Sequence, residues 1–205
     1  MAAGGGSRFG RHKQYERLGE RRVLDWALQA ARAVSEGIVL VVPAGEAARG
    51  EPGVDAVVAG GATRSASVRA GLAAVPGEAA IVVVHDAARP LASVALFERV
   101  IAAVAEGEEA VVPGVALTST IKRVAGGHVA ETVDRASLVE VQTPQAFRAA
   151  CLRAAHAGGH DATDDAALVE ALGVAVAVVE GEASNIKVTH PPDLAVARAL
   201  LDHRP

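Results

Sequence analysis

The sequence predicts an α/β fold, a doubly wound and mostly parallel sheet with helices on both sides. Short β-branched runs alternate along the chain with segments of helical periodicity, which is the pattern of this class. The strand candidates are apolar at consecutive positions, as expected when helices cover both faces of a sheet. With 205 residues, 51% of them hydrophobic, the chain can bury one sizeable core, and we expect a single domain over residues 1–205.

The predicted elements follow one another in regular order. Strands are expected at residues 38–42, 54–58, 81–84, 110–112 and 174–179. Helices are expected at residues 23–34, 66–75, 94–105, 146–157 and 164–172. A last helix begins at the two prolines 191–192, which preset φ for a first turn, and continues to about residue 201.

One stretch, residues 120–132, breaks this alternation. Gly126 and Gly127 separate two short strand-like segments there, which is the pattern of a β-hairpin. A hairpin inserted in a parallel domain, with few large side chains of its own, is expected to pack on another subunit. We therefore expect a protruding arm over about residues 117–140 and a homodimer.

Composition and charge exclude several classes of protein. With 2% aromatic residues and a net charge of -4, the chain offers neither a stacking platform nor a basic stripe, so no nucleic acid partner is expected. A single cysteine excludes a disulfide framework and a cysteine-based zinc site. No apolar run approaches the roughly 20 residues that span a bilayer, and the N-terminus lacks the apolar core of a secretory signal. We expect a cytoplasmic protein that makes no membrane contact.

The first candidate site lies at residues 2–13. Its glycines allow the backbone to approach a ligand closely, and the cations Arg8 and Lys13 follow them, an arrangement suited to phosphate. The segment is neither a Walker loop nor a dinucleotide fingerprint, because the region about 20 residues on is helical and supplies no ribose-binding acid. Considered alone, the segment also fits a flexible N-terminal tail.

Two further polar segments lie where predicted strands end. Residues 60–68 open a helix, so their N–H groups and hydroxyls can bind a ligand or simply cap that helix. Residues 85–90 follow the strand 81–84 at its carboxyl end, where doubly wound folds bind ligands. There Asp86 can hold Mg²⁺ and Arg89 a phosphate, with a surface ion pair as the alternative.

The remaining polar candidates are ambiguous by themselves. Thr163 precedes two acids and also fits an ordinary helix start. Lys187 lies among apolar neighbours, where a solvated lysine at a strand edge is the alternative. His156 and His160 have helical spacing, but the glycines between them argue against a helix that presents both to a metal.

Taken together and in this order, the segments resemble the 2-C-methyl-D-erythritol 4-phosphate cytidylyltransferase family. The resemblance covers nearly the whole chain through Ala-Ala-Gly-x-Gly-x-Arg, Lys-Gln-Tyr, Gly-Gly-x-x-Arg-x-x-Ser-Val, His-Asp-Ala-Ala-Arg-Pro, Thr-Ile-Lys, Gln-Thr-Pro-Gln-x-Phe, Thr-Asp-Asp-Ala and Asn-Ile-Lys-Val-Thr. It implies a modified α/β nucleotide-binding domain with a β-arm that makes a homodimer. It also implies transfer of a cytidylyl group from CTP to the methylerythritol phosphate, with release of pyrophosphate, in the non-mevalonate isoprenoid pathway.

The resemblance implies a role for each residue that matches a motif. The CTP loop would comprise Ala2, Ala3, Gly4 and Gly6. Cytosine, ribose and other nucleotide contacts would come from Gly61, Ala62, Ser67 and Ala87. Asp86 would bind Mg²⁺ or another divalent cation. The polyol phosphate would be held by Arg89, Thr120, Thr143, Thr163 and Lys187, with Arg135 reaching in from the partner subunit. The catalytic cations would be Arg8, Lys13 and Lys187.

The implied chemistry explains why no catalytic base is visible. A phosphate monoester is mostly dianionic at neutral pH, since its second pKa is about 6, so it needs no base to attack the α-phosphorus of CTP. The barrier is electrostatic, because one anion must approach another, and the cations with Mg²⁺ address it.

Other functions remain open at this point. A ribitol or other polyol 5-phosphate cytidylyltransferase shares the nucleotide half, and a catalytically silent nucleotide-binding module is a candidate of another class. Within the motifs, His12 stands where a proline usually precedes Lys-Gln, and Ser119 replaces the usual acid before Thr-Ile-Lys. A buried central strand is also expected to run directly into the loop at Ala2, so we expect the natural protein to begin several residues upstream of Met1.

Overall fold

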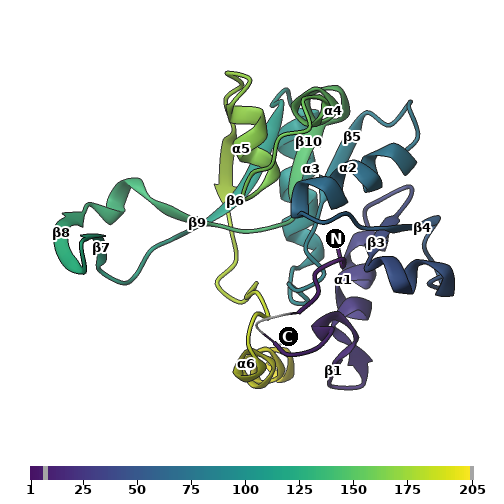
Figure 1. Cartoon of the computed structure of the whole chain (residues 1–205), viewed down its shortest axis with the longest axis horizontal. Coiled ribbons are helices and arrows are strands. Elements are labelled where there is room, and N and C mark those ends of the chain that lie inside the picture. The colour runs from purple at the N-terminus through teal and green to yellow at the C-terminus, as the bar shows by residue number, and fades with distance from the viewer. Residues whose placement is uncertain (7–8, 204–205) are drawn as a thin grey trace.

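Helices cover both faces of a mixed β-sheet, and a long hairpin arm extends from one side of it (Figure 1). The computed structural model describes residues 1–6 and 9–203. Its helices are α1 (Val23–Arg32), α2 (Arg64–Ala74), α3 (Val94–Ala105), α4 (Ala149–Ala157), α5 (Asp165–Glu170) and α6 (Pro191–Asp202). Its strands are β1 (Arg17–Leu18), β2 (Arg21–Arg22), β3 (Val39–Val42), β4 (Ala56–Ala59), β5 (Ile81–Val84), β6 (Ala110–Ala116), β7 (Ile121–Ala125), β8 (His128–Val133), β9 (Val139–Val141), β10 (Gln145–Arg148) and β11 (Ala177–Glu180).

The main sheet has five strands in the order β11-β6-β10-β5, with β9 paired to the far end of β6. β11 runs parallel to β6, whereas β10 runs antiparallel to both of its neighbours. The expectation of an α/β fold is therefore confirmed, but the sheet is mixed rather than mostly parallel. The departure arises because the chain returns from the arm along β9 and enters β10 in the opposite direction to β5 and β6.

The predicted strand 81–84 and helix 94–105 have the bounds expected, and the other predicted elements are present with shifted ends. The prediction of one helix over residues 146–157 is wrong at its start. Residues 145–148 form the buried strand β10, and the helix begins only at residue 149. The missed segment is only four residues long and contains no β-branched side chain, so local propensity gave no strand signal.

The alternation of side chains along the central strands divides the core between the two faces. Val82, Val84 and Phe147 pack with α2, α4 and α5, while Val83 packs with α1 and α3 and Ala146 packs with α3. This alternation is the period of two expected of a strand. Because both sets are apolar, the sheet is buried on both faces, as the sequence indicates.

A second, two-stranded sheet is formed by β3 and β4, which run parallel. Met1 and Ala2 connect it to the main sheet, since the N–H of Ala2 donates to the carbonyl of Val41 at 2.7 Å and the N–H of Ala87 donates to the carbonyl of Met1 at 2.9 Å. The first residues of the chain thus lie between the ends of β3 and β5.

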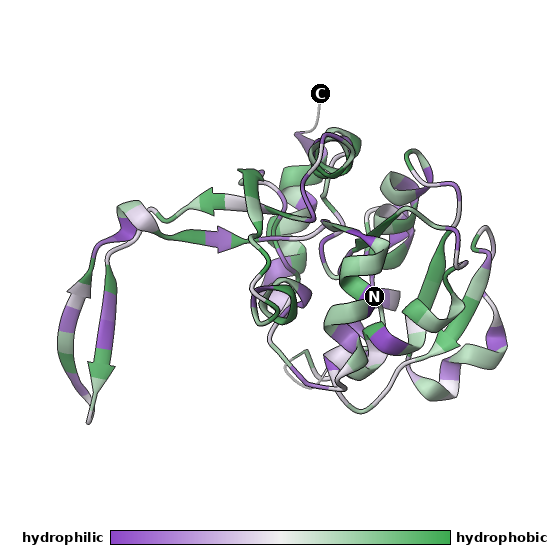
Figure 2. Ribbon diagram, turned by 90° about the horizontal axis from the view of Figure 1, so that it is seen from above, coloured by the Kyte–Doolittle hydropathy of each residue, from purple (hydrophilic) through white to green (hydrophobic). Residues whose placement is uncertain are grey.

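The expected hairpin is confirmed in its geometry. β7 and β8 pair antiparallel around Gly126 and Gly127, whose φ values of +56° and +79° are those that a tight two-residue turn demands. The arm extends away from the body in both views (Figures 1 and 2). Val124 and Val129 lie opposite each other on it and are 61% and 62% exposed.

Within residues 1–6 and 9–203, none of the helices combines the length and the hydropathy that a transmembrane segment requires.

We expect Phe147→Ala to lower the free energy of unfolding by about 3–5 kcal/mol, because this side chain is fully buried between α2, α4 and α5. Denaturant titration measures the change. Val196→Ala, at a side chain that is 51% exposed on α6, serves as the control and is expected to alter stability by less than about 0.5 kcal/mol. Equal stability losses in the two variants would contradict this account of the core.

Candidate active site

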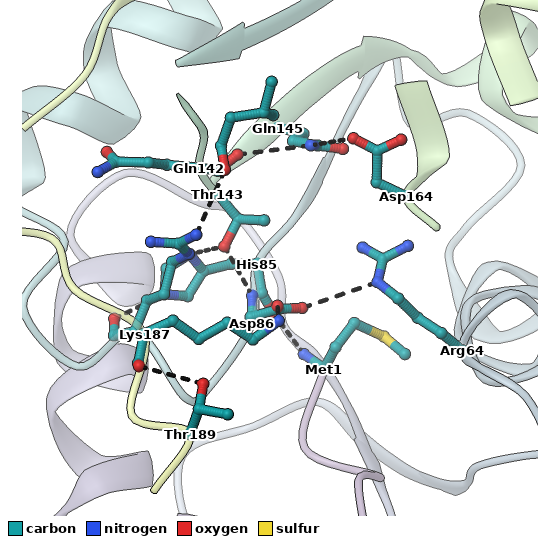
Figure 3. Close-up of polar contacts among 12 residues, drawn as sticks. Met1, Arg64, His85, Asp86, Gln142, Thr143, Gln145, Asp164, Lys187 and Thr189 are labelled. Atoms are coloured by element: carbon teal, nitrogen blue, oxygen red, sulfur yellow. Dashed lines mark hydrogen bonds and ion pairs between the residues drawn. The ribbon is translucent and has the colours of Figure 1, made fainter. Parts of the chain in front are cut away.

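The polar segments singled out in the sequence converge at one edge of the sheet. Asp86 follows β5, Gly60 and Gly61 follow β4, and Lys187 comes after β11. β10 runs antiparallel, so the residues before it, including Thr143, lie at this same edge. Figure 3 shows Asp86, Thr143 and Lys187 beside one another in the resulting site.

Asp86 lies between two cations at the centre of this edge. Its Oδ2 accepts a hydrogen bond from Lys187 Nζ at 2.6 Å, and its Oδ1 lies 3.9 Å from Arg64 Nε (Figure 3). Burial opposes ionisation of the carboxyl, but Lys187 and Arg64 outweigh it and hold the pKa of Asp86 well below its usual value. Asp86 is therefore a carboxylate at neutral pH.

A chain of hydrogen bonds links the backbone of Asp86 to the side chains of Thr143 and His85. The N–H of Asp86 donates to Thr143 Oγ1 at 3.0 Å, and Oγ1 lies 3.2 Å from His85 Nδ1. His85 Nε2 lies 3.1 Å from the carbonyl oxygen of Arg89, which can only accept, so Nε2 carries the proton and Nδ1 accepts from Thr143. Burial lowers the pKa of His85 to about 3, so the imidazole is neutral and this chain of donors has a defined direction.

The N-terminal glycine loop is held at both of its described ends. Ala2 is buried, and its carbonyl accepts a hydrogen bond from the buried side chain of Gln14 at 2.9 Å. Phe9 is buried on the other side, and its N–H donates to the carbonyl of Gly6 at 2.8 Å. Gly6 has φ +66°, and a Cβ there would lie 1.8 Å from the carbonyl oxygen of Arg11, so only glycine fits.

The second glycine segment lies against the first. A Cβ at Gly60 would lie 2.4 Å from the Cβ of Ala3, so the absence of a side chain permits the close approach. Ser67 on α2 accepts a hydrogen bond from the N–H of Gly61 at 3.1 Å, and Thr63 caps the helix by accepting from the N–H of Ala66. The two glycine-rich segments therefore form one continuous wall beside Asp86.

The segment that carries Lys187 is fastened on both sides of that residue. The N–H of Val188 donates to the carbonyl of Ala88 at 2.8 Å, and Arg89 Nη1 donates to the carbonyl of Asn185 at 2.7 Å. Gln142 accepts from the Asn185 amide at 3.1 Å. Gln142 and Asn185 are buried framework residues that were not predicted to have a role, and their pairing over 43 residues has no local signal in the sequence.

Most of the predicted site residues fall into three groups. The structure brings together Ala2, Ala3, Gly61, Ser67, Asp86, Ala87, Arg89, Thr143 and Lys187. It places Thr120 and Arg135 at exposed positions flanking the two strands of the arm, and Thr163 at an exposed position before α5. Arg8 lies outside the described residues. Arg89 and Thr143 are buried and bonded within the framework, so their assignment to the polyol phosphate stays a prediction.

Sequence reasoning missed a buried group next to Asp86. Arg64 Nη2 lies 2.8 Å from Oδ2 of Asp165, and His156 Nε2 lies 2.9 Å from Oδ1 of the same carboxylate. Asp165 is fully buried, and His156 is 4% exposed. The only signal for Arg64 was its fixed place in Gly-Gly-x-x-Arg, and nothing in the sequence indicated that His156 and Asp165 meet it.

The donor set at this edge fits a magnesium ion that arrives with a phosphate ligand. Asp86 provides one ionised carboxylate, and the described ranges hold no group of three or more His, Cys, Asp or Glu side chains that could bind a metal ion by themselves. Mg²⁺ is commonly held by one or two carboxylates together with substrate phosphates. The surrounding cations, Lys187 and Arg64, suit the phosphates of such a complex.

Comparison with known proteins gives consistent matches. The family model described as 2-C-methyl-D-erythritol 4-phosphate cytidylyltransferase matches residues 1–203. The enzyme of that name from Thermus thermophilus is 44% identical over 204 residues, which cover 97% of this chain and 93% of that protein. The crystal structure of the Thermus thermophilus enzyme aligns with a TM-score of 0.85 at 41% identity, covering 98% of this chain and 96% of that one.

Some relatives are longer than this chain. The bifunctional enzyme IspD/IspF of Anaeromyxobacter dehalogenans is 45% identical over 219 residues, which cover 98% of this chain and 56% of that protein. The match to the bifunctional enzyme of Nitratidesulfovibrio vulgaris is 51% identical over 147 residues and covers 70% of this chain and 37% of that protein. The chain thus spans about half the length of these bifunctional relatives.

The neutral state of His85 predicts a pH dependence of stability. Its folded-state pKa of about 3 lies below the unfolded value of 6.5, so the unfolded chain binds the extra proton as pH falls below 6.5. This group therefore lowers the free energy of unfolding by up to about 1.4 kcal/mol per pH unit between pH 6 and 4. Urea titrations at pH 7, 6, 5 and 4 measure the slope.

We expect His85→Asn to flatten this slope relative to the unmodified protein. The matched control is His128→Asn, on the exposed arm, which should keep the slope. Indistinguishable slopes for the His85 variant and the unmodified protein would show that His85 is not held neutral.

Proposed function

The chain belongs to the 2-C-methyl-D-erythritol 4-phosphate cytidylyltransferase family, and we propose that it transfers the cytidylyl group of CTP to 2-C-methyl-D-erythritol 4-phosphate. Pyrophosphate is the second product. The observation that carries the proposal is the Asp86–Lys187 pair at 2.6 Å, which stands at the sheet edge beside the two glycine-rich segments. One acid and one cation at this place suit a metal-bound nucleotide and a second phosphate.

The nucleotide is proposed to lie along the wall formed by the two glycine segments. Gly4 and Gly5 are exposed, and a Cβ at either would meet nothing within 4 Å, so their backbone is open to a ligand. The backbone at Gly61, held by Ser67, supplies fixed polar groups for the base and ribose. Mg²⁺, when bound at Asp86, would bridge phosphate oxygens and neutralise part of their charge.

The transfer step needs positioning and charge stabilisation from the chain. A phosphate oxygen of the polyol phosphate attacks the α-phosphorus of CTP, a new P–O bond forms, and the bond to the pyrophosphate oxygen breaks. The attacking dianion requires no base, so no proton is moved. Lys187 and Lys13, with Arg8, are proposed to stabilise the negative charge that spreads over the α-phosphate and the leaving group.

The arm is proposed to pair two subunits and to complete the polyol-phosphate site. Val124 and Val129 expose apolar surface on an arm that extends away from the described body of the subunit. Arg135, at the base of the arm, is exposed and donates to the carbonyl of Thr118 within the same arm. A dimer of this form would place Thr120 and Arg135 at the partner's site.

Incubation of the protein with CTP, Mg²⁺ and the methylerythritol phosphate should release pyrophosphate, measured by a coupled phosphate assay. We expect turnover with this substrate to exceed that with ribitol 5-phosphate, and EDTA to abolish it. If pyrophosphate is released with ribitol 5-phosphate but not with the methylerythritol phosphate, the proposed substrate is wrong. If EDTA leaves the rate unchanged, the proposed requirement for a metal ion is wrong.

Lys187→Ala should lower kcat by roughly 10²–10³-fold, the range found when one group that stabilises transition-state charge is removed. Arg49→Ala, at an exposed arginine outside the predicted site segments, is the control for loss of a positive charge. Circular dichroism checks that both variants fold. A kcat for Lys187→Ala within threefold of the control would exclude Lys187 from the charge stabilisation.

Val129→Asp should convert the protein from dimer to monomer, because a charge on the buried part of an interface is costly to desolvate. Sedimentation velocity measures the state, and Val196→Asp on α6, at a similarly exposed valine, provides the comparison. The monomer should show a raised KM for the polyol phosphate. Full activity in a monomeric sample would show that the arm does not contribute to the polyol-phosphate site of a partner subunit.

A further inference from the structure

Two cations contact Asp86, and they differ in how firmly they are held. Lys187 is 41% exposed at its side chain, and its ammonium group donates to Asp86. Arg64 is 25% exposed, and its guanidinium is also paired with the fully buried Asp165. Lys187 can leave Asp86 by rotating its side chain into solvent, whereas Arg64 is held in place by Asp165.

The buried group behind Arg64 joins three helices. Arg64 is the first residue of α2, Asp165 is the first residue of α5, and His156 lies on α4. The carboxylate of Asp165 has one oxygen 2.8 Å from Arg64 and the other 2.9 Å from His156 Nε2, which donates to it. The two contacts use opposite oxygens, so the carboxylate cannot rotate without losing both.

This arrangement is a poor way to stabilise the fold. Desolvation of a fully buried carboxylate offsets much of what an ion pair contributes, and apolar side chains of similar volume often serve as well. The neighbouring Asp164 already caps α5 by accepting from the N–H of Ala167 at 3.0 Å, so Asp165 is not needed to begin the helix. In addition, Arg64 Nη1 and His156 Nδ1 are buried without a hydrogen-bond partner. The contacts among Arg64, Asp165 and His156 therefore fix the position of the Arg64 side chain, although they leave two buried nitrogen atoms without a hydrogen-bond partner.

We propose that Arg64 is a positioning residue for the Asp86 carboxylate, and that Asp165 and His156 act through it, while Lys187 is the partner that exchanges. The inference rests on the proposed function, in which Asp86 meets the metal–nucleotide complex. When that complex binds, Lys187 moves from Asp86 to a phosphate oxygen, and Arg64 keeps the carboxylate in place.

The order in which the metal and the nucleotide bind follows from the difference in mobility between Lys187 and Arg64. Asp86 is already ion-paired, so a free divalent cation must compete with Lys187 for Oδ2. A metal that arrives with nucleotide phosphates brings a replacement partner for the ammonium group. The metal and the nucleotide therefore bind cooperatively, and the fixed position of Arg64 determines how well the carboxylate is oriented for them.

The test measures Mn²⁺ binding by electron paramagnetic resonance, with and without saturating CTP. In the unmodified protein we expect CTP to strengthen Mn²⁺ binding, and Asp86→Asn to abolish the effect. Asp165→Asn keeps the shape but removes the charge that holds Arg64, and should weaken Mn²⁺ binding in the presence of CTP by about 10–100-fold, the usual effect of losing a residue that orients a metal ligand. His156→Leu should weaken it in the same direction, and His156→Gln, which retains a donor at the Nε2 position, should restore it to within about threefold of the unmodified protein.

Leu168→Ala, a core residue on the same helix α5, is the matched control for a general loss of stability. It should lower the melting temperature but leave Mn²⁺ affinity unchanged at a temperature where all variants are folded. If Asp165→Asn does not fold, Arg64→Lys takes its place, because lysine keeps the charge but cannot contact both carboxylates through one planar group.

Two results would overturn the inference: Mn²⁺ affinity equal to that of the unmodified protein in Asp165→Asn or its replacement, or an equal loss in Leu168→Ala. The proposed function fails separately, if the unmodified protein binds no Mn²⁺ with CTP or releases no pyrophosphate.

Discussion

The antiparallel pairing of β10 between β5 and β6 is the constraint on which the site depends. Gln145 lies opposite Val84 in this pairing, so the residues just before β10 meet the residues just after β5. Thr143 thereby reaches the N–H of Asp86, and Gln142 reaches the loop that carries Lys187. A parallel strand in this position would have put the Gln-Thr-Pro segment at the opposite edge, more than 10 Å away for a strand of four residues.

The positively charged side chains around Asp86 suit a ligand that carries several negative charges. The carboxylate has Lys187 on one oxygen and Arg64 near the other, and the glycine-rich walls expose backbone rather than side chains. Cations placed at an open edge of the sheet raise the local affinity for phosphate groups. The same cations keep Asp86 ionised, so the site is ready for a metal without any change in protonation.

The sequence predicted those parts of the fold and site that have local signals. The strand 81–84 and the helix 94–105 were found at their true bounds because the strand consists entirely of β-branched residues and the helix has a long apolar pattern with clear ends. The position of Asp86 followed from its place after a strand, and the glycine segments from the need for close backbone approach. β10 was missed because four residues of Gln, Ala, Phe and Arg become a strand only through pairing with β5 and β6. The Arg64–Asp165–His156 group was missed because its members are joined only by tertiary packing across three helices. The roles of Arg8, Thr120 and Arg135 remain expectations from the family resemblance.

The contact between Lys187 and Asp86 also has a consequence for how the molecule is made. The two residues are 101 positions apart, and the neighbouring bond from Arg89 to Asn185 spans 96 positions. Contacts of such high sequence separation form late and slow the folding of a chain, because the closing loop must be ordered first. Synthesis proceeds from the N-terminus, so the glycine wall and Asp86 emerge from the ribosome long before the segment that completes the site. During that interval Asp86 lacks its lysine partner, and the nascent domain holds an incomplete site that acquires this partner only when the segment after β11 has been added.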